Sequence, residues 1–201
     1  MRIPNHIGII PDGNRRWARE NGLTKEKGYD YGLEPGMELF KLCEKIGIKE
    51  LTYYGFTVNN TKRPTIQRLA FTKSCINAVT MLTKKDAELL VVGNTKSDMF
   101  PEKLLPYTEE RKTFGKGGTK VNFLVNYGWQ WDLAEKFKSK DISRVDLIIR
   151  WGGRRRLSGF LPIQSVYADF YIIDDYWPDF KPEHLFQALE WYDIQDITLG
   201  G

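Results

Sequence analysis

Two short segments of the chain concentrate side chains that bind anions. The first is PDGNRRWA at residues 11–18, where a carboxylate, an amide and two guanidinium groups surround a glycine. Arginine binds phosphate oxygens through paired N–H donors, and the amides after Gly13 can begin a helix whose N-terminus attracts an anion. Asp12 would repel a phosphate unless a cation lay between them, and Mg²⁺ typically links a carboxylate to a diphosphate. The segment therefore predicts a diphosphate site with Mg²⁺. The alternative is a plain N-cap, because Asp and Asn begin many helices with no ligand present.

The second segment is RWGGRRRLSGF at residues 150–160, which combines four arginines with three glycines and one serine. Glycine lets the backbone approach an oxyanion closely. Burying several cations together is costly without an anion, so these arginines either extend into water or bind one. Arg154 and Arg155 fit a solvated surface equally well. Arg150 differs from them because it ends an apolar run, which predicts a second anion site.

The elements that must position these segments follow an α/β pattern. Apolar runs that predict strands alternate with longer segments of helical spacing. The strands expected are 7–10, 51–56, 88–92, 120–126, 145–150 and 169–173. The helices expected are 35–45, 65–84 and 182–193, with a loop at 115–118. This alternation predicts a single domain over residues 1–201, with a mostly parallel central sheet flanked by helices.

Both anion-binding segments directly follow an expected strand. Residues 12–16 come after strand 7–10, and residues 152–156 come after strand 145–150. Ligands of open parallel sheets bind beyond the carboxyl ends of the strands. We therefore expect the two segments to lie at the same edge of the sheet, where they suit two small anions.

Composition excludes several classes of protein. The net charge of +4, from 30 basic and 26 acidic residues, is too small to indicate nucleic-acid binding, and aromatic and basic residues are not interleaved as stacking on bases requires. No apolar run approaches the roughly 20 residues of a transmembrane helix. Nothing at the N-terminus resembles a signal peptide, and Cys43 and Cys75 fit core thiols. These features predict a cytoplasmic protein.

The motifs, taken together, resemble the cis-prenyltransferase family, whose best-known members are undecaprenyl diphosphate synthases. The resemblance covers nearly the whole chain, in the order of the family. It rests on HIGIIPDGNRRWA (6–18), YYGFTVNNTKRP (53–64), VNFLVNYGWQWD (121–132), VDLIIRWGGRRRLSGFLPIQSVYADFY (145–171), WPDF (177–180) and the closing Gly200-Gly201.

The resemblance implies a fold, an activity and a set of site residues. Family members are homodimers with a parallel sheet, and they join an allylic diphosphate to isopentenyl diphosphate with Mg²⁺. By resemblance, the catalytic residues are Asp12, Asn14 and Asn60, and the metal ligands are Asp12 and Asp169. The remaining substrate-binding residues would be Gly13, Arg15, Arg16, Trp17, Lys25, Tyr29, Arg63, Arg150, Arg156 and Ser158, with Gly200 and Gly201 reaching the partner subunit's site.

Such a reaction needs an apolar cavity but no protein nucleophile. The apolar faces of helices 35–45 and 65–84, with Phe56, Phe123 and Leu124, are candidates for the cavity wall, and the alternative is that they are ordinary core. The two histidines form no catalytic triad. His6 matches a common family residue or is a packing histidine, and His184 is expected on a surface helix.

The chain also departs from the family pattern. Lys25 stands in place of a usual arginine, Tyr29 in place of a usual histidine, and Asp169 in place of a glutamate. The segment between 132 and 145 is short, and the helix after Pro64 is about a turn short, which predicts a short product. Some departures are similar to the lavandulyl and cyclolavandulyl diphosphate synthase branch.

Three functions remain open beside regular elongation. Irregular head-to-middle coupling and terpene cyclisation would use the same fold. A non-catalytic partner subunit is the third, although such subunits typically lose the Asp-Gly-Asn sequence that this chain keeps at 12–14.

Overall fold

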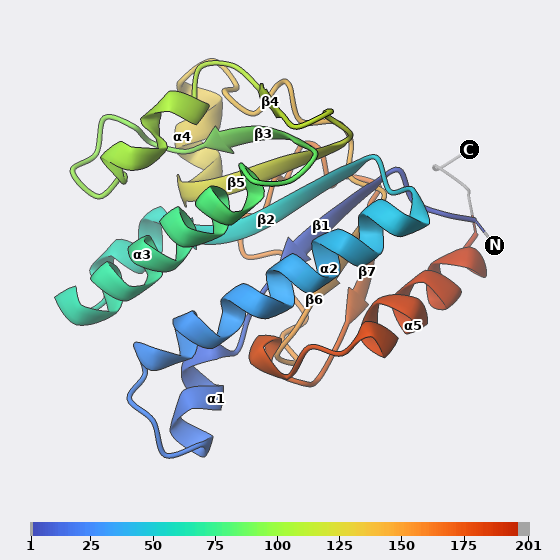
Figure 1. The fold of residues 1–201 in the computed structure, drawn as a ribbon, viewed down its shortest axis with the longest axis horizontal. Helices are drawn as coiled ribbons and strands as arrows, with labels where there is room; N and C mark the ends of the chain where they lie inside the picture. The colour runs from blue at the N-terminus through green and yellow to red at the C-terminus, as the bar shows by residue number, and fades with distance from the viewer. Residues whose placement is uncertain (1, 197–201) are drawn as a thin grey trace.

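A seven-stranded sheet forms the centre of the computed structural model, which describes residues 2–196 (Figure 1). The strand order is β4-β3-β5-β2-β1-β6-β7. Every neighbouring pair is parallel except β3 and β4, which are antiparallel. The strands are β1 (His6–Ile10), β2 (Glu50–Thr57), β3 (Ala87–Val92), β4 (Lys112–Phe114), β5 (Thr119–Tyr127), β6 (Leu147–Arg150) and β7 (Asp169–Ile172).

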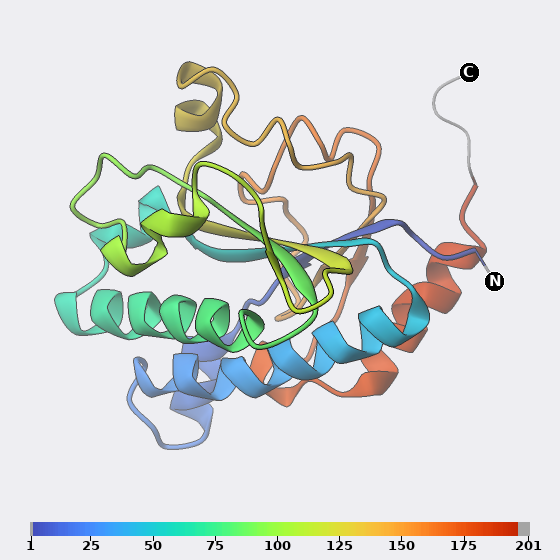
Figure 2. The ribbon, with the colours of Figure 1, turned by 45° about the horizontal axis from the view of Figure 1, so that its top comes forward.

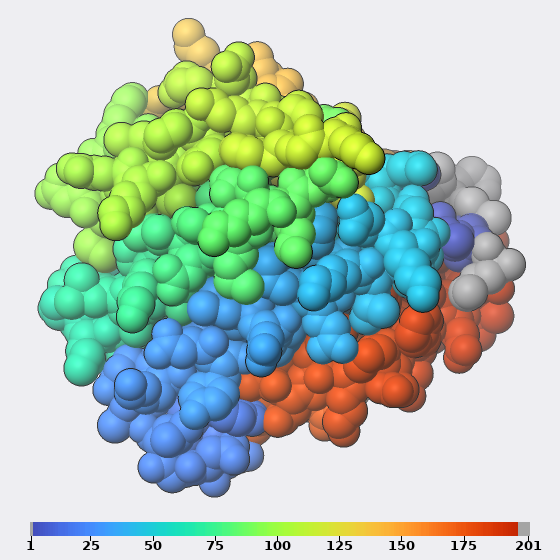
Figure 3. All heavy atoms as spheres, viewed as in Figure 1, coloured from blue at the N-terminus to red at the C-terminus, as the bar shows by residue number. Residues whose placement is uncertain are grey.

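Helices cover the two faces of the sheet unequally. The long helices α2, α3 and α5 pack on one face, and α4 lies on the other with irregular segments from the second half of the chain (Figure 2). On the outer surface α3, α2 and α5 lie side by side (Figure 3). The α-helices are α1 (Asn14–Glu20), α2 (Leu33–Ile46), α3 (Thr65–Leu82), α4 (Trp129–Ala134) and α5 (Pro182–Asp193). Short 3₁₀ helices are η1 (Lys27–Gly32), η2 (Val58–Lys62), η3 (Glu102–Tyr107) and η4 (Trp177–Asp179).

The core has two parts, one on each face of the sheet. Strand β1 is buried along its whole length, which explains its nearly continuous apolar sequence. Helix α2 buries Met37, Phe40 and Cys43, which recur at helical spacing, and it ends at Gly47 with φ of 94°. The thiols of Cys43 and Cys75 are buried and free, as predicted. No helix among residues 2–196 is long and apolar enough to cross a membrane.

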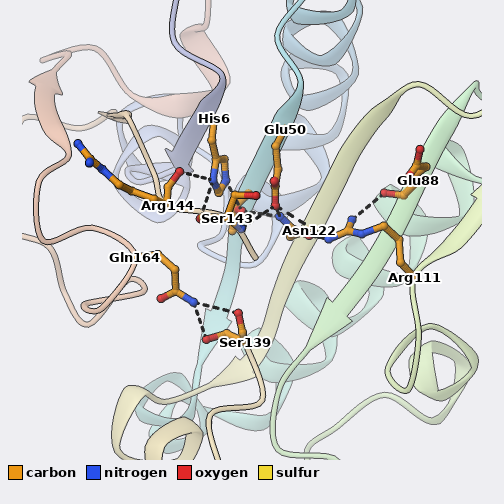
Figure 4. Close-up of polar contacts among 10 residues, drawn as sticks. His6, Glu50, Glu88, Arg111, Asn122, Ser139, Ser143, Arg144 and Gln164 are labelled. Atoms are coloured by element: carbon orange, nitrogen blue, oxygen red, sulfur yellow. Dashed lines mark hydrogen bonds and ion pairs between the residues drawn. The ribbon is translucent and has the colours of Figure 1, made fainter. Parts of the chain in front are cut away.

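A buried polar network joins the strands near their amino ends (Figure 4). The Asn122 amide donates to Glu50 Oε1 at 2.7 Å, and Arg111 Nη2 donates to Asn122 Oδ1 at 2.7 Å. His6 Nδ1 lies 3.0 Å from the carbonyl oxygen of Ser143. Its other ring nitrogen, Nε2, lies 2.8 Å from the hydroxyl of Thr52. His6 is therefore a packing residue far along the strand from the anion-binding segments.

The predicted α/β fold with a mostly parallel sheet is confirmed, and each expected strand and helix is present within a few residues of its expected bounds. Strand β4 was not predicted, because three residues at an edge carry no readable periodicity. His184 lies on helix α5 at the outer surface, as expected, but its side chain faces the interior. This side chain is buried, and its ring contacts Trp151 and Phe180.

Candidate active site

The two anion-binding segments meet at one edge of the sheet. Strands β1 and β6 are neighbours, and Ile10 pairs with Arg150 in their register. Residues 11–16 and 151–158 therefore both begin where these parallel strands end. Arg150 Nη2 lies 2.7 Å from Asp12 Oδ2, so the segments are in direct contact. The prediction that they share an edge is confirmed.

Asp12 is held as a carboxylate in this contact. The Gly13 amide donates to Asp12 Oδ1 at 2.6 Å, and Arg16 Nη2 lies 3.5 Å from the same oxygen. Burial raises the pKa of Asp12, but the hydrogen bond and charge of Arg150, with the charge of Arg16, outweigh it and hold the pKa below its usual value. One third of the side chain remains exposed, so the carboxylate can reach a ligand.

Arg150 is a buried cation with a fixed orientation. Its side chain is 4% exposed, and Nη1 donates to Ser158 Oγ at 2.9 Å and to the carbonyl of Arg156. Ser158 adopts φ of 54°, and Tyr54 donates its hydroxyl to the Ser158 carbonyl at 3.0 Å. These contacts turn the segment after β6 back over the strand end and bring the predicted residues Arg150, Arg156 and Ser158 together.

Glycine is required at one position in each segment. Gly13 has φ of 105°, and a Cβ there would lie 2.6 Å from the ring of Tyr176. Gly152 has φ of 81°, and its Cβ would lie 2.5 Å from Arg16 Nη2. Neither position accepts an ordinary side chain without displacing its neighbours.

Most of the predicted site residues line one cavity of about 810 Å³. This volume lies within the range of small-molecule sites. The predicted residues in its wall are Asp12, Gly13, Asn14, Arg15, Arg16, Lys25, Tyr29, Asn60, Arg63, Arg150, Arg156 and Ser158. Six of these predicted side chains are cationic and surround one hollow, which favours an anionic ligand.

Contacts within the wall orient several of these residues. Arg63 Nη1 donates to the hydroxyl of Tyr29 at 2.9 Å. Burial raises the pKa of Tyr29 although Arg63 and Arg15 oppose the rise, so the phenol keeps its proton at neutral pH. Asn60 Oδ1 accepts from the Thr57 amide at 3.1 Å, which fixes the turn into η2.

The structure does not bring Asp169 to Asp12. Asp169 pairs with Leu147 at the beginning of β7, whereas Asp12 follows the ends of the parallel strands. Its carboxylate lies 3.8 Å from Arg2 Nη2. Within one chain Asp169 therefore lies apart from Asp12, and its role as a metal ligand stays a prediction. In residues 2–196 no three His, Cys, Asp or Glu side chains form a group able to hold a metal by themselves.

One further predicted residue of the described chain lies outside the cavity wall. Trp17 is directed away, because its indole donates to Asp179 Oδ1 at 2.7 Å and its ring lies 4.7 Å from that of Tyr31. Its contact with substrate stays a prediction that the cavity wall does not support. Gly200 and Gly201 lie outside the described residues.

Sequence reasoning missed part of the wall. Tyr54 on β2 and Tyr127 at the end of β5 line the cavity, as do Gln130, Arg19 and Arg154. The signal for Tyr127 was its position at the end of an expected strand, at the edge where both anion segments were expected. Arg154 was treated as equally suited to solvent, and the structure places it in the wall.

A smaller apolar cavity of about 90 Å³ adjoins the first. Met37 of α2, Phe71 of α3 and Phe123 of β5 line it, in agreement with the expected helices. Phe56 lines the larger cavity instead, and Leu124 belongs to the core on the opposite face, so its expected place in this wall is wrong.

Four residues belong to both cavities and form a neck between them: Pro11, Asn14, Tyr29 and Gly55. The Asn14 amide nitrogen donates to the Pro11 carbonyl at 2.9 Å, and its Oδ1 is buried with no hydrogen-bond partner among the described residues. An unpaired buried acceptor is costly, so a donor or a cationic centre of a ligand fits here. The arrangement suits a molecule with an anionic head and an apolar tail.

Comparisons with known proteins agree with this geometry. Residues 10–142 and 133–200 match the family described as "Putative undecaprenyl diphosphate synthase". The chain is 34% identical to an isoprenyl transferase of Clostridium tetani, with 99% of this chain and 90% of the relative covered. It is 29% identical to the ditrans,polycis-undecaprenyl-diphosphate synthase ((2E,6E)-farnesyl-diphosphate specific) of Aliivibrio fischeri, with 98% and 89% covered.

A solved structure shares the fold. Lavandulyl diphosphate synthase from Lavandula x intermedia, in complex with dimethylallyl diphosphate, superposes with a TM-score of 0.83 over 98% of both chains, at 23% identity. The family match spans nearly the whole chain, and the site joins cationic and apolar cavities at one sheet edge. The chain therefore belongs to the undecaprenyl diphosphate synthase family of cis-prenyltransferases, enzymes that condense prenyl diphosphates.

Proposed function

We propose that this chain is a Mg²⁺-dependent prenyltransferase that condenses an allylic diphosphate with isopentenyl diphosphate, or a second prenyl diphosphate, into a short-chain product. One observation carries the proposal: two cationic segments are in contact through Asp12 and Arg150, at the wall of a cavity that adjoins an apolar one. Two diphosphates can then lie side by side with a tail directed toward the apolar cavity.

The two diphosphates are assigned to different segments. Arg15 and Arg16 would hold the allylic diphosphate, because they lie beside the neck that leads to the apolar cavity. Arg150, Arg156 and Ser158 would hold the second diphosphate from the other side. Asn14 lines both cavities at the neck, where the reacting carbon of the allylic substrate would be placed.

The residues present fit Mg²⁺ only together with substrate. Asp12 offers one partly exposed carboxylate, and Mg²⁺ commonly binds one or two carboxylates together with substrate phosphates. When bound, the ion neutralises negative charge that develops on the leaving diphosphate.

The side chains of this protein stabilise and orient the reactants. Breaking the allylic C–O bond leaves both bonding electrons on the diphosphate, whose charge Arg15 and Arg16 stabilise. The Asn14 carbonyl dipole favours the positive charge on the allylic carbon. The second substrate, held by Arg150, presents its alkene to that carbon, so the reaction becomes effectively intramolecular. Loss of a proton from the new cation restores a double bond.

Two features support a short product. The apolar cavity, about 90 Å³, is much smaller than the cationic cavity of about 810 Å³. The alignment with the C. tetani relative also runs over 234 positions, at least 33 more than this chain of 201 residues possesses. The competing outcome is a product whose prenyl group is as long as the undecaprenyl group in the name of the A. fischeri relative.

A homodimer is part of the proposal. Exposed apolar side chains gather on α4 and on the neighbouring segment 157–168: Trp129, Leu133, Ile163, Val166 and Tyr167. A second copy of the chain is the partner that we propose for this surface, since contiguous apolar patches mark interaction sites. Light scattering of the purified protein tests it, and a monomer at all concentrations would contradict it.

The activity test uses purified protein with Mg²⁺ and labelled isopentenyl diphosphate. Dimethylallyl, geranyl and farnesyl diphosphate are supplied in turn, and dimethylallyl diphosphate is also supplied alone. Mass spectrometry of the products gives chain length and distinguishes regular elongation from head-to-middle coupling and cyclisation. We expect short diphosphate products. If no substrate or pair of substrates yields a product, the chain is not a catalyst and the proposal fails.

A further inference from the structure

A closed ring of hydrogen bonds lies behind the anion-binding edge. The indole N–H of Trp151 donates to His184 Nδ1 at 3.2 Å, and His184 Nε2 donates to Asp175 Oδ2 at 3.0 Å. The backbone carbonyl of Asp175 accepts from the Gly152 amide at 2.8 Å. Because Trp151 and Gly152 are consecutive, these three bonds close a ring that joins α5, the end of β6 and the segment after β7.

The donors around His184 fix its proton. Both the Trp151 indole and the Lys181 backbone amide direct N–H groups at Nδ1, so Nδ1 must be the acceptor. The ring proton therefore resides on Nε2, where the Asp175 carboxylate accepts it. This tautomer satisfies every member of the ring with a buried imidazole between Trp151 and Phe180.

The ring holds Gly152, which touches both anion-binding segments. A Cβ on Gly152 would lie 2.5 Å from Arg16 Nη2 and 3.2 Å from the backbone of Asp12, and Arg150 is two residues earlier. A shift of the Gly152 backbone would therefore disturb Asp12, Arg16 and Arg150 together.

The residues that follow Asp175 support the first segment from the other side. The ring of Tyr176 packs on Gly13 and lies 5.0 Å from the Arg16 guanidinium. The Trp177 amide donates to the Asp12 carbonyl at 3.0 Å. Fixing the position of Asp175 therefore fixes contacts to both segments.

We propose that Asp175 and His184 are positioning residues that hold the two diphosphate-binding segments at their working separation through the ring formed with Trp151 and Gly152. Neither side chain lines the cavity, so neither touches substrate. The inference rests on the proposed function, because the segments are taken to bind diphosphate.

The test compares two neighbouring carboxylates. Asp175→Ala removes the bond to His184 but keeps the backbone carbonyl that binds Gly152. Because the Asp175 side chain is 52% exposed, the fold should tolerate its truncation. Asp174→Ala removes the same charge one residue earlier, from an exposed side chain with no side-chain hydrogen bond in the described structure. Asp175→Asn keeps an acceptor for His184 Nε2 without the charge.

The expected result is a selective loss of diphosphate affinity. Asp175→Ala should raise the Kd for inorganic pyrophosphate with Mg²⁺, and the KM for both substrates, about 2- to 10-fold. Its kcat and melting temperature should stay near those of the wild type, because chemistry and core packing are unchanged. Asp174→Ala and Asp175→Asn should bind pyrophosphate within about twofold of the wild type.

Three outcomes separate the possible failures. Equal affinities for Asp175→Ala and Asp174→Ala would overturn the inference and leave the proposed function intact. If Asp175→Asn binds pyrophosphate as weakly as Asp175→Ala does, the charge matters and the hydrogen bond does not. That result also overturns the inference. No pyrophosphate binding by the wild-type chain would remove the proposed function and this inference with it.

Discussion

Asp12 and Arg150 form the contact on which the site depends. They lie in different anion-binding segments, and Arg150 Nη2 forms a salt bridge of 2.7 Å with Asp12 Oδ2. Because Arg150 is buried, removing its partner would leave a cation uncompensated. A substitution that keeps the shape and acceptor of Asp12 is therefore the informative one.

We expect Asp12→Asn to lower kcat/KM by roughly 100-fold or more, because the charge that attracts the metal and pairs with Arg150 is lost. The free energy of unfolding should fall by about 1–3 kcal/mol, the range for a lost charge-assisted bond. Steady-state kinetics and chemical denaturation measure these effects. Asp179→Asn is the control, since Asp179 also accepts a side-chain hydrogen bond but lies outside the cavity wall. Unchanged kinetics of Asp12→Asn would remove the metal argument.

Gly152 provides a second test at the residue scale. Gly152→Ala should impair activity and destabilise the fold, because its Cβ would meet Arg16 Nη2 at 2.5 Å in addition to the strain of positive φ. Gly22→Ala shares the strain, with φ of 70°, but would meet no atom within 4 Å. The strain alone costs about 1 kcal/mol. Turnover that falls equally in both variants would show that the contact with Arg16 is unimportant.

At the scale of elements, the network at the amino ends of the strands makes stability depend on pH. Burial lowers the pKa of His6 below its usual 6.5 although Glu50 opposes the shift, so the folded chain holds a neutral imidazole. Burial raises the pKa of Glu50, but hydrogen bonds from Ser143 and Asn122 and the charge of Arg111 outweigh it and lower the pKa. Below about pH 6.5 the unfolded chain binds more protons at His6 than the folded chain does.

The free energy of unfolding should therefore rise as pH rises from about 5 to about 7, and His6→Asn should flatten that slope. Denaturation with urea at a series of pH values measures it. Glu50 acts in the same direction at lower pH, where its carboxylate must be protonated. A slope that is identical in the wild type and in His6→Asn would contradict this account of the network.

The prediction about product length concerns a residue of helix α3. Phe71 is buried and lines the apolar cavity, where its ring lies 4.5 Å from that of Phe56. Phe71→Leu should enlarge this cavity and shift the products toward longer chains, as mass spectrometry of the products would show. Phe186→Leu, at an exposed position on α5, is the matched control. Identical products from both variants would show that this cavity does not limit chain length.

The sequence predicted those parts of the fold and site that depend on regular patterns. Strand ends could be read from apolar runs, so the shared edge of residues 12–16 and Arg150 followed from sheet geometry. The separation of Asp169 from Asp12 was not predicted, because the resemblance gave Asp169 a role but not its position at the beginning of β7. The burial of the His184 side chain was not predicted, because helical spacing alone does not reveal its hydrogen bonds with Asp175 and Trp151. Contacts between distant segments leave no periodic signal.

At the scale of the whole molecule, the two proposed diphosphate sites lie at one sheet edge and meet at the contact between Asp12 and Arg150. The site is built from the ends of β1, β2, β5 and β6, which are adjacent in the sheet. Such an arrangement should bind two diphosphates in one chain at the same time. Arg150 belongs to only one of the two sites, so its substitution should affect them unequally.

The most direct measurement is a calorimetric titration. The chain is first saturated with Mg²⁺ and an unreactive thiolo analogue of dimethylallyl diphosphate, and isopentenyl diphosphate is then added. The account predicts that one isopentenyl diphosphate binds beside one analogue in each chain. Arg150→Lys should weaken isopentenyl diphosphate at least about 10-fold and the analogue by less than about threefold. Mutually exclusive binding of the two ligands, or an equal loss of affinity for both, would contradict the claim of two separate sites.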